Sequence, residues 1–166
     1  MAEVLFGGKP VTLLGNEVNV GDEAPEFTVV DHELNEVHSS KWNNTVRLIA
    51  SVPSIDTGVC DAETRRFNEE AANLPGVNVI TISADLPFAQ GRWCAARGIE
   101  NLEVLSDYRH LSFGEAFGVH MKDVRLLARA VFVIDSSNKI TYKEIVPNVH
   151  EHPNYEKAIA AAKEAK

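Results

Sequence analysis

The middle of the chain alternates between strand and helix patterns, and this alternation restricts the possible folds more than any other feature. Apolar runs at 46–52 and 77–83 predict two strands, and each is followed by a segment with helical periodicity, at 60–74 and 87–97. Connections this short between neighbouring strands require right-handed crossovers, which make the strands parallel. The pattern therefore predicts an α/β protein with helices packed on a central sheet.

The second half of the chain adds further strands, a short helix and a closing helix, expected at 102–105, 111–117, 126–134, 139–146 and from Asn154 onward. A turn at 135–138 joins the last two strands into an antiparallel hairpin. This order matches a thioredoxin-like fold with a mixed central sheet flanked by helices. A chain of 166 residues supports one good core and is too short for two ordinary domains, so we expect one domain over 1–166.

The N-terminal segment has a strand pattern of its own. Apolar runs at 4–6 and 11–14 flank a polar stretch, Gly7 to Pro10, and predict a β-hairpin with a four-residue turn. We interpret residues 1–20 as an N-terminal hairpin extension of the main fold. Two further short strands are expected at 27–30 and 36–38.

Charge and hydropathy exclude several classes of partner. The 24 acidic and 16 basic residues give a formal net charge of -8, which opposes binding to nucleic acid and to anionic membranes. The first residues lack the basic and apolar regions of a signal peptide, and no apolar run approaches bilayer-spanning length. We therefore expect a cytoplasmic protein without a nucleic-acid or membrane partner.

The chain contains two cysteines, Cys60 and Cys94, which lie too far apart in sequence for a Cys-x-x-Cys motif. Structural disulfides are uncommon in reducing compartments, so each thiol is either buried and inert or reactive. The residues around each cysteine must distinguish these two possibilities.

Cys60 is expected in the first turn of a helix, directly after a strand and a loop. Unpaired backbone N–H groups and the helix dipole at such a position favour a thiolate. Thr57 adds a hydroxyl one turn before the sulfur, and Pro53 adds a ring that limits the access of water. The alternative is that Cys60 is an ordinary small residue on the buried helix face, with Thr57 and Pro53 as cap and loop residues.

Arg129 interrupts an apolar run at 126–134 that otherwise predicts a strand buried on both faces. A buried guanidinium needs an anion or several acceptors, and a thiolate beside a developing oxyanion would meet that need. A structural salt bridge to a carboxylate, or a strand end that reaches solvent, would also accommodate this arginine.

Cys94 is expected on the helix at 87–97, whose buried face should contain Ala89, Trp93 and Ala96. Cys94 lies off the centre of that face. A partly exposed position suits a residue that must move and react, whereas the alternative is simple packing beside Trp93.

Taken together, Pro53-x-x-x-Thr57-x-x-Cys60 and a distant arginine in a strand resemble the active-site signature of the peroxiredoxins. The segments that begin at Trp93, Ser106 and Ala128 resemble the thiol peroxidase branch, the bacterial atypical two-cysteine group. The resemblance extends over essentially the whole chain.

This resemblance implies that Cys60 is the peroxidatic cysteine and Cys94 the resolving cysteine, while Pro53, Thr57 and Arg129 position and activate the peroxide. It implies reduction of hydrogen peroxide and of alkyl or lipid hydroperoxides through a sulfenic acid and an intrachain disulfide. Thioredoxin is the implied reductant and a homodimer the implied assembly, with no metal or organic cofactor. A peroxide-sensing redox switch remains the alternative, and the missing Cys-x-x-Cys argues against a thioredoxin-type exchanger.

A disulfide requires two α-carbons within about 7 Å of each other. Cys60 at the start of one helix and Cys94 within the next would normally lie farther apart. We therefore predict that one or both helices unwind locally when the disulfide forms.

Overall fold

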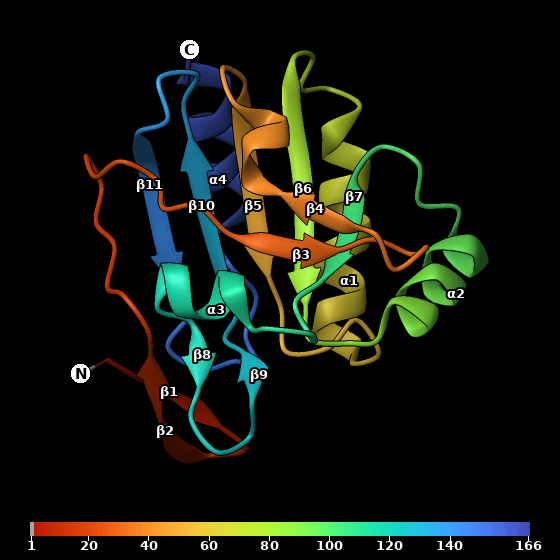
Figure 1. Cartoon of the computed structure of the whole chain (residues 1–166), viewed down its shortest axis with the longest axis vertical. Helices are drawn as coiled ribbons and strands as arrows, with labels where there is room; N and C mark the ends of the chain where they lie inside the picture. The colour runs from red at the N-terminus through yellow and green to blue at the C-terminus, as the bar shows by residue number, and fades with distance from the viewer. Residues whose placement is uncertain (1) are drawn as a thin grey trace.

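The computed structural model describes residues 2–166, and these form a larger and a smaller β-sheet (Figure 1). The larger sheet has the order β11 (Ile140–Ile145), β10 (Ala130–Ile134), β5 (Val46–Ser51), β6 (Val77–Ser83), β7 (Glu103–Ser106), β3 (Thr28–Val30) and β4 (Glu36–His38). The smaller sheet has the order β1 (Glu3–Phe6), β2 (Lys9–Leu14), β8 (His120–Met121) and β9 (Leu126–Leu127).

The centre of the larger sheet confirms the predicted α/β arrangement. β5, β6 and β7 pair in parallel, connected through α1 (Gly58–Ala71) and α2 (Pro87–Arg97). β10 and β11 form the predicted antiparallel hairpin, and β10 also pairs antiparallel with β5. The protein therefore has the expected thioredoxin-like fold with a mixed central sheet.

Helices cover both faces of this sheet, as Figure 1 shows with α1 and α4 (Tyr155–Glu164) behind it and α3 (Ser112–Phe117) in front. Successive residues of β5 point to opposite faces because side chains alternate along a strand. Leu48 belongs to an apolar cluster with Phe67 of α1 and Ile159 of α4. Its neighbour Ile49 belongs to a second cluster with Phe113 of α3.

The N-terminal hairpin is present, but its turn is shorter than predicted. Gly7 and Gly8 form the turn with φ values of 60° and 80°, in the left-handed region that glycine adopts without strain. Lys9 and Pro10 already belong to β2. A short 3-10 helix, η1 (Ser39–Trp42), follows β4 and was not predicted.

The strand predicted at 126–134 is instead two strands in different sheets, and this prediction was wrong. β9 pairs with β8 in the smaller sheet, whereas β10 lies in the larger sheet. The chain changes sheets at Ala128 and Arg129, where the Ala128 amide donates to the Val119 carbonyl at 2.8 Å. Arg129 therefore lies at the break between two strands rather than inside one.

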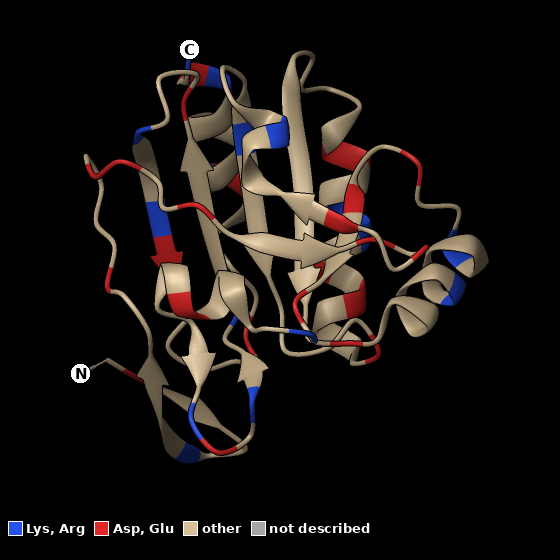
Figure 2. Cartoon of the chain, in the orientation of Figure 1, with Lys and Arg blue, Asp and Glu red and all other residues tan. Residues whose placement is uncertain are grey.

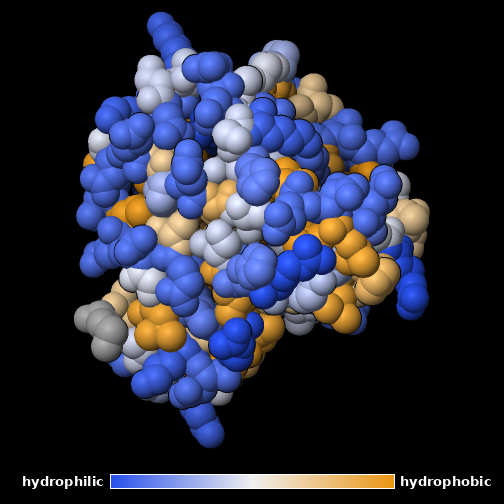
Figure 3. Space-filling view, in the orientation of Figure 1, coloured by the Kyte–Doolittle hydropathy of each residue, from blue (hydrophilic) through white to orange (hydrophobic). Residues whose placement is uncertain are grey.

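The charged residues are spread over the molecule in Figure 2, and the face in Figure 3 is mostly hydrophilic with small hydrophobic patches. Within residues 2–166, no helix has the length and hydropathy needed to cross a membrane.

Candidate active site

Cys60 lies in the first turn of α1, after a loop that is anchored to the sheet. Its side chain is fully buried. The loop is held by Asp85, whose carboxylate accepts hydrogen bonds from Ser54 Oγ at 2.7 Å and from the Ile55 amide at 2.8 Å. Asp85 therefore fixes the path of the chain into the helix, a role that the sequence did not predict.

Arg129 lies directly against the sulfur. Its Nη2 donates to Cys60 Sγ at 3.1 Å, and its Nη1 donates to Glu63 Oε1 at 2.9 Å. Its Nε donates to the Val149 carbonyl at 2.9 Å, so the buried guanidinium has an acceptor on each nitrogen. Two of the alternatives predicted for Arg129, a contact with the cysteine and a salt bridge to a carboxylate, are thus both observed.

These acceptors determine the charge of the arginine. Burial opposes ionisation of Arg129, but the charges of Glu63 and Cys60 outweigh it and raise the pKa of the guanidinium above its ordinary value. The guanidinium therefore remains a cation within the core, at hydrogen-bond distance from the sulfur.

Glu63 is the residue that sequence reasoning missed. Its side chain is fully buried, and its second oxygen, Oε2, has no hydrogen-bond partner among the described residues. Desolvation raises the pKa of Glu63 to about 7, although the charge of Arg129 opposes this increase. A signal was present, because Glu63 follows Cys60 by three residues and so shares its helix face.

Thr57 and Pro53 flank the cysteine in different ways. Pro53 is buried. Thr57 is the N-terminal cap residue of α1 and is exposed, and its hydroxyl donates to the Ser54 carbonyl at 3.2 Å. The threonine hydroxyl is therefore bonded to the loop that precedes the helix.

Cys94 is half-buried on α2, and both cysteines are free thiols. Burial raises the pKa of the Cys94 thiol to about 11, so at neutral pH this residue is a protonated thiol while the helix is folded. Its side chain lines a pocket together with His32, Ile99 and Leu102. The expected partly exposed position of Cys94 is thus observed.

The buried face predicted for α2 was wrong in part. Trp93 is buried as expected, but Ala89 and Ala96 are exposed. Gln90 lies inside instead, because its Nε2 donates to Ser83 Oγ at 3.0 Å and to the Leu105 carbonyl at 2.9 Å. Two acceptors on the sheet thus bring a polar side chain to the inner face.

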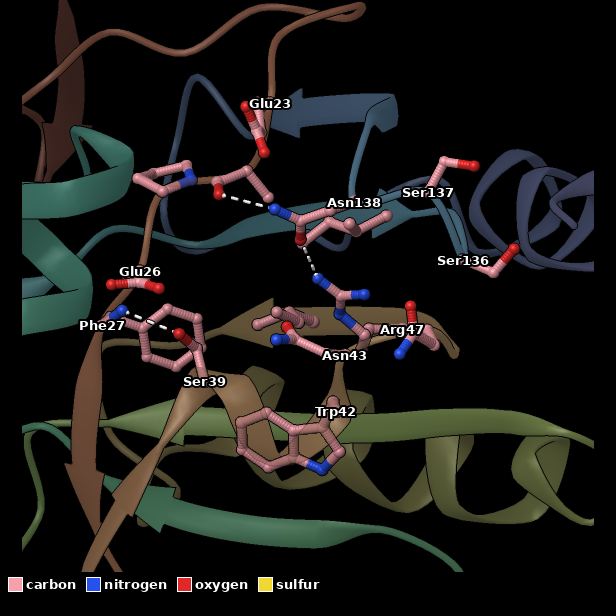
Figure 4. A pocket seen from close by; sticks show the side chains of 15 residues that line it. Glu23, Glu26, Phe27, Ser39, Trp42, Asn43, Arg47, Ser136, Ser137 and Asn138 are labelled. Carbon is pink, nitrogen blue, oxygen red and sulfur yellow. Dashed lines mark hydrogen bonds between the residues drawn. The ribbon is translucent and has the colours of Figure 1, made fainter.

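A polar pocket lies at the opposite end of β5 from the Cys60 loop (Figure 4). Arg47 is buried there and donates to the Thr45 carbonyl at 2.9 Å and to Asn138 Oδ1. Asn138 in turn donates to the Ala24 carbonyl at 3.2 Å. These bonds connect three segments of chain, which gives this arginine a structural role.

Comparison with known proteins identifies the family. A model of the Redoxin family matches residues 19–159. The chain belongs to the Redoxin family. Its curated relatives include a thiol peroxidase from Bacillus subtilis, 61% identical over 98% of both chains. Another, from Listeria monocytogenes, is 58% identical over 99% of this chain and 100% of the relative. They confirm the predicted resemblance to the thiol peroxidase branch.

Solved structures agree with the assignment of this chain to the Redoxin family. A peroxiredoxin-like protein from Aquifex aeolicus has a TM-score of 0.92 and 44% identity, covering 98% of this chain and 96% of its own. A thiol peroxidase from Chromobacterium violaceum has a TM-score of 0.88 and 22% identity, covering 98% and 95%, and shows the fold alone.

Proposed function

We propose that this Redoxin protein is a thiol-dependent peroxidase whose attacking group is the sulfur of Cys60. Peroxidase activity, with a peroxide as substrate and a thiol as reductant, follows from the thiol peroxidases that it matches over nearly its whole length. The observation that supports the residue assignment best is the 3.1 Å contact between Arg129 Nη2 and Cys60 Sγ in a buried site. A buried cation at hydrogen-bond distance stabilises a thiolate at this position.

The first step is nucleophilic attack on the peroxide. The Cys60 thiolate attacks the terminal oxygen, the O–O bond breaks, and the leaving hydroxide or alkoxide takes up a proton to form water or an alcohol. Arg129 and the Thr57 hydroxyl hold the two oxygens and stabilise the negative charge that develops on the leaving one. Cys60 is thereby oxidised to a sulfenic acid.

The second step restores the enzyme. The Cys94 thiol condenses with the Cys60 sulfenic acid, forming a disulfide and releasing water. A dithiol reductant then reduces this disulfide to two thiols and becomes a disulfide itself. Because burial keeps the folded Cys94 protonated, unwinding of its helix both brings the sulfurs together and allows this thiol to ionise.

Several finer features belong to this proposal. Thioredoxin is the proposed reductant, hydrogen peroxide and alkyl or lipid hydroperoxides are the proposed substrates, and a homodimer is the proposed assembly. The reducing cytoplasm is the proposed compartment, which suits two free cysteines.

The test is steady-state consumption of hydrogen peroxide with thioredoxin, thioredoxin reductase and NADPH. The proposal predicts sustained turnover by the wild-type protein and none by Cys60→Ser. A peroxide-sensing switch would be oxidised once and then turn over only slowly, so oxidation of Cys60 without sustained NADPH consumption would contradict the enzymatic role.

A further inference from the structure

An ion pair connects the two helices that carry the cysteines. Asp61 follows Cys60 on α1, and Arg97 is the last residue of α2, three positions after Cys94. Asp61 Oδ2 accepts a hydrogen bond from Arg97 Nε at 2.9 Å and forms an ion pair with Arg97 Nη2 at 2.8 Å. Both nitrogens of one edge of the guanidinium thus bind the carboxylate, which fixes the separation of the two helices at this point.

Further contacts hold both partners in place. Asp61 Oδ1 accepts a hydrogen bond from Arg65 Nε at 2.8 Å within α1. Arg97 lies over the Trp93 ring, 5.1 Å from its centroid. Although desolvation opposes ionisation, the bonds from Arg97 and Arg65 keep the pKa of Asp61 below its ordinary value. The carboxylate is therefore charged at neutral pH.

The charges on the two helices suit this contact. α2 carries Arg92 and Arg97 and no acidic residue, whereas α1 has several acidic positions (Figure 2). The side chains of Asp61 and Arg97 are 20% and 36% exposed, so the pair lies at the surface but is partly shielded from solvent.

The pair joins the two segments that we predict to move when the disulfide forms. Cys60 is fully buried in the first turn of α1, and Cys94 is half-buried within α2. We predict that bringing their α-carbons within about 7 Å unwinds the first turn of α1, the C-terminal half of α2, or both. The first of these segments contains Asp61 and the second contains Arg97.

We propose that the Asp61–Arg97 pair must break before Cys94 can reach Cys60, and that it thereby sets the rate of disulfide formation. This inference rests on the proposed function. Its consequence concerns the fate of the sulfenic acid. While the pair holds, a second hydrogen peroxide can oxidise the sulfenic acid to a sulfinic acid, transferring one oxygen and leaving water. A strong pair therefore increases sensitivity to excess peroxide.

The alternative is a surface ion pair that only adds a little stability. The two roles differ in their readout. A stability role changes the unfolding free energy alone, whereas a positioning role changes the rate of disulfide formation relative to the rate at which Cys60 is first oxidised.

The variant for the test is Arg97→Gln, which removes the contact between the helices. Arg65→Gln is the matched control, because Arg65 binds the same carboxylate but lies on α1 and makes no connection to α2. The protein is mixed rapidly with hydrogen peroxide, quenched with an alkylating agent at successive times, and analysed by mass spectrometry. Each sample gives the fractions of thiol, sulfenic, sulfinic and disulfide forms.

We expect Arg97→Gln to be oxidised at Cys60 at the wild-type rate and to form the disulfide about two to five times faster, with less sulfinic acid. Arg65→Gln should form the disulfide at nearly the wild-type rate. A double variant with both Asp61→Asn and Arg97→Gln should form the disulfide at nearly the same rate as Arg97→Gln alone, because both substitutions remove the same contact.

Three results would overturn the proposal. They are an unchanged rate of disulfide formation in Arg97→Gln, an equal acceleration in Arg65→Gln, or fully additive effects of Asp61→Asn and Arg97→Gln. Failure of the proposed function would differ visibly, because Cys60 of the wild-type protein would then remain a thiol after mixing with peroxide.

Discussion

Arg129 and Glu63 form a wholly buried ion pair, with 2.9 Å between Nη1 and Oε1. The same guanidinium also donates to the sulfur of Cys60. One cation therefore lies between two groups that can each carry a negative charge. Burial raises the pKa of Glu63 to about 7, although the charge of Arg129 opposes this increase.

Glu63 makes the stability of the protein depend on pH. Its pKa rises from 4.5 to about 7 on folding, so the stability it contributes is fully present below pH 4.5 and is lost as the pH rises through about 7. Glu63→Gln should therefore have a flatter profile of unfolding free energy between about pH 4.5 and 7, measured by urea denaturation.

A second buried carboxyl serves as an internal control in that experiment. Desolvation raises the pKa of Asp107 to about 6. Asp107 therefore makes the same pH-dependent contribution to the free energy of unfolding in the wild-type protein and in Glu63→Gln. Only the difference between the two profiles reports on Glu63. Parallel profiles over this pH range would contradict the assigned protonation of this residue.

Arg129→Lys should slow oxidation of Cys60 by about 100-fold or more, because an ammonium cannot reproduce the planar set of donors to sulfur, carboxylate and carbonyl. The measurement is the rate of Cys60 oxidation after rapid mixing with hydrogen peroxide. Arg47→Lys is the control, since Arg47 is buried but lies at the other end of β5. Equal losses of rate in the two variants would show that the effect is only structural.

Thr57→Val tests whether the hydroxyl takes part in the reaction. Valine keeps the branched shape but removes the donor, so oxidation of Cys60 should slow by roughly 10- to 100-fold. Thr57→Ser keeps the hydroxyl and should retain most of the wild-type rate. If Thr57→Val and wild type react equally fast, the bond from Thr57 to the Ser54 carbonyl is its only role.

Cys94→Ser separates the two chemical steps. The variant should oxidise Cys60 at the wild-type rate, accumulate the sulfenic acid and then stop turning over with thioredoxin, because the second thiol is missing. A dimedone-type probe followed by mass spectrometry detects the trapped form. Continued turnover at the wild-type rate would exclude Cys94 as the resolving cysteine.

The sequence predicted the fold because its signals were local. Pro87 and Gly98 mark the ends of α2, and Gly98 has the left-handed conformation, with φ of 62°, that ends a helix. The parallel pairing of β5 and β6 follows from the short helical connection between them. The contact between Cys60 and Arg129 was foreseen for a different reason, since a buried arginine needs an anion.

Other features depend on contacts between distant segments and gave no comparable signal. The break at Ala128 exists because strands on both sides belong to different sheets, which apolar character alone does not show. Gln90 is buried because two acceptors on the sheet satisfy its amide, and those partners are known only once the sheet is assembled. The assignment of residues 1–166 to a single domain stays a prediction.

The most direct test of the account is the mass of the wild-type protein after one equivalent of hydrogen peroxide, combined with peptide mapping. We predict a loss of two hydrogens and a single new linkage between the peptides that contain Cys60 and Cys94. An unchanged mass, or oxygen added at Cys94 while Cys60 remains a thiol, would contradict it.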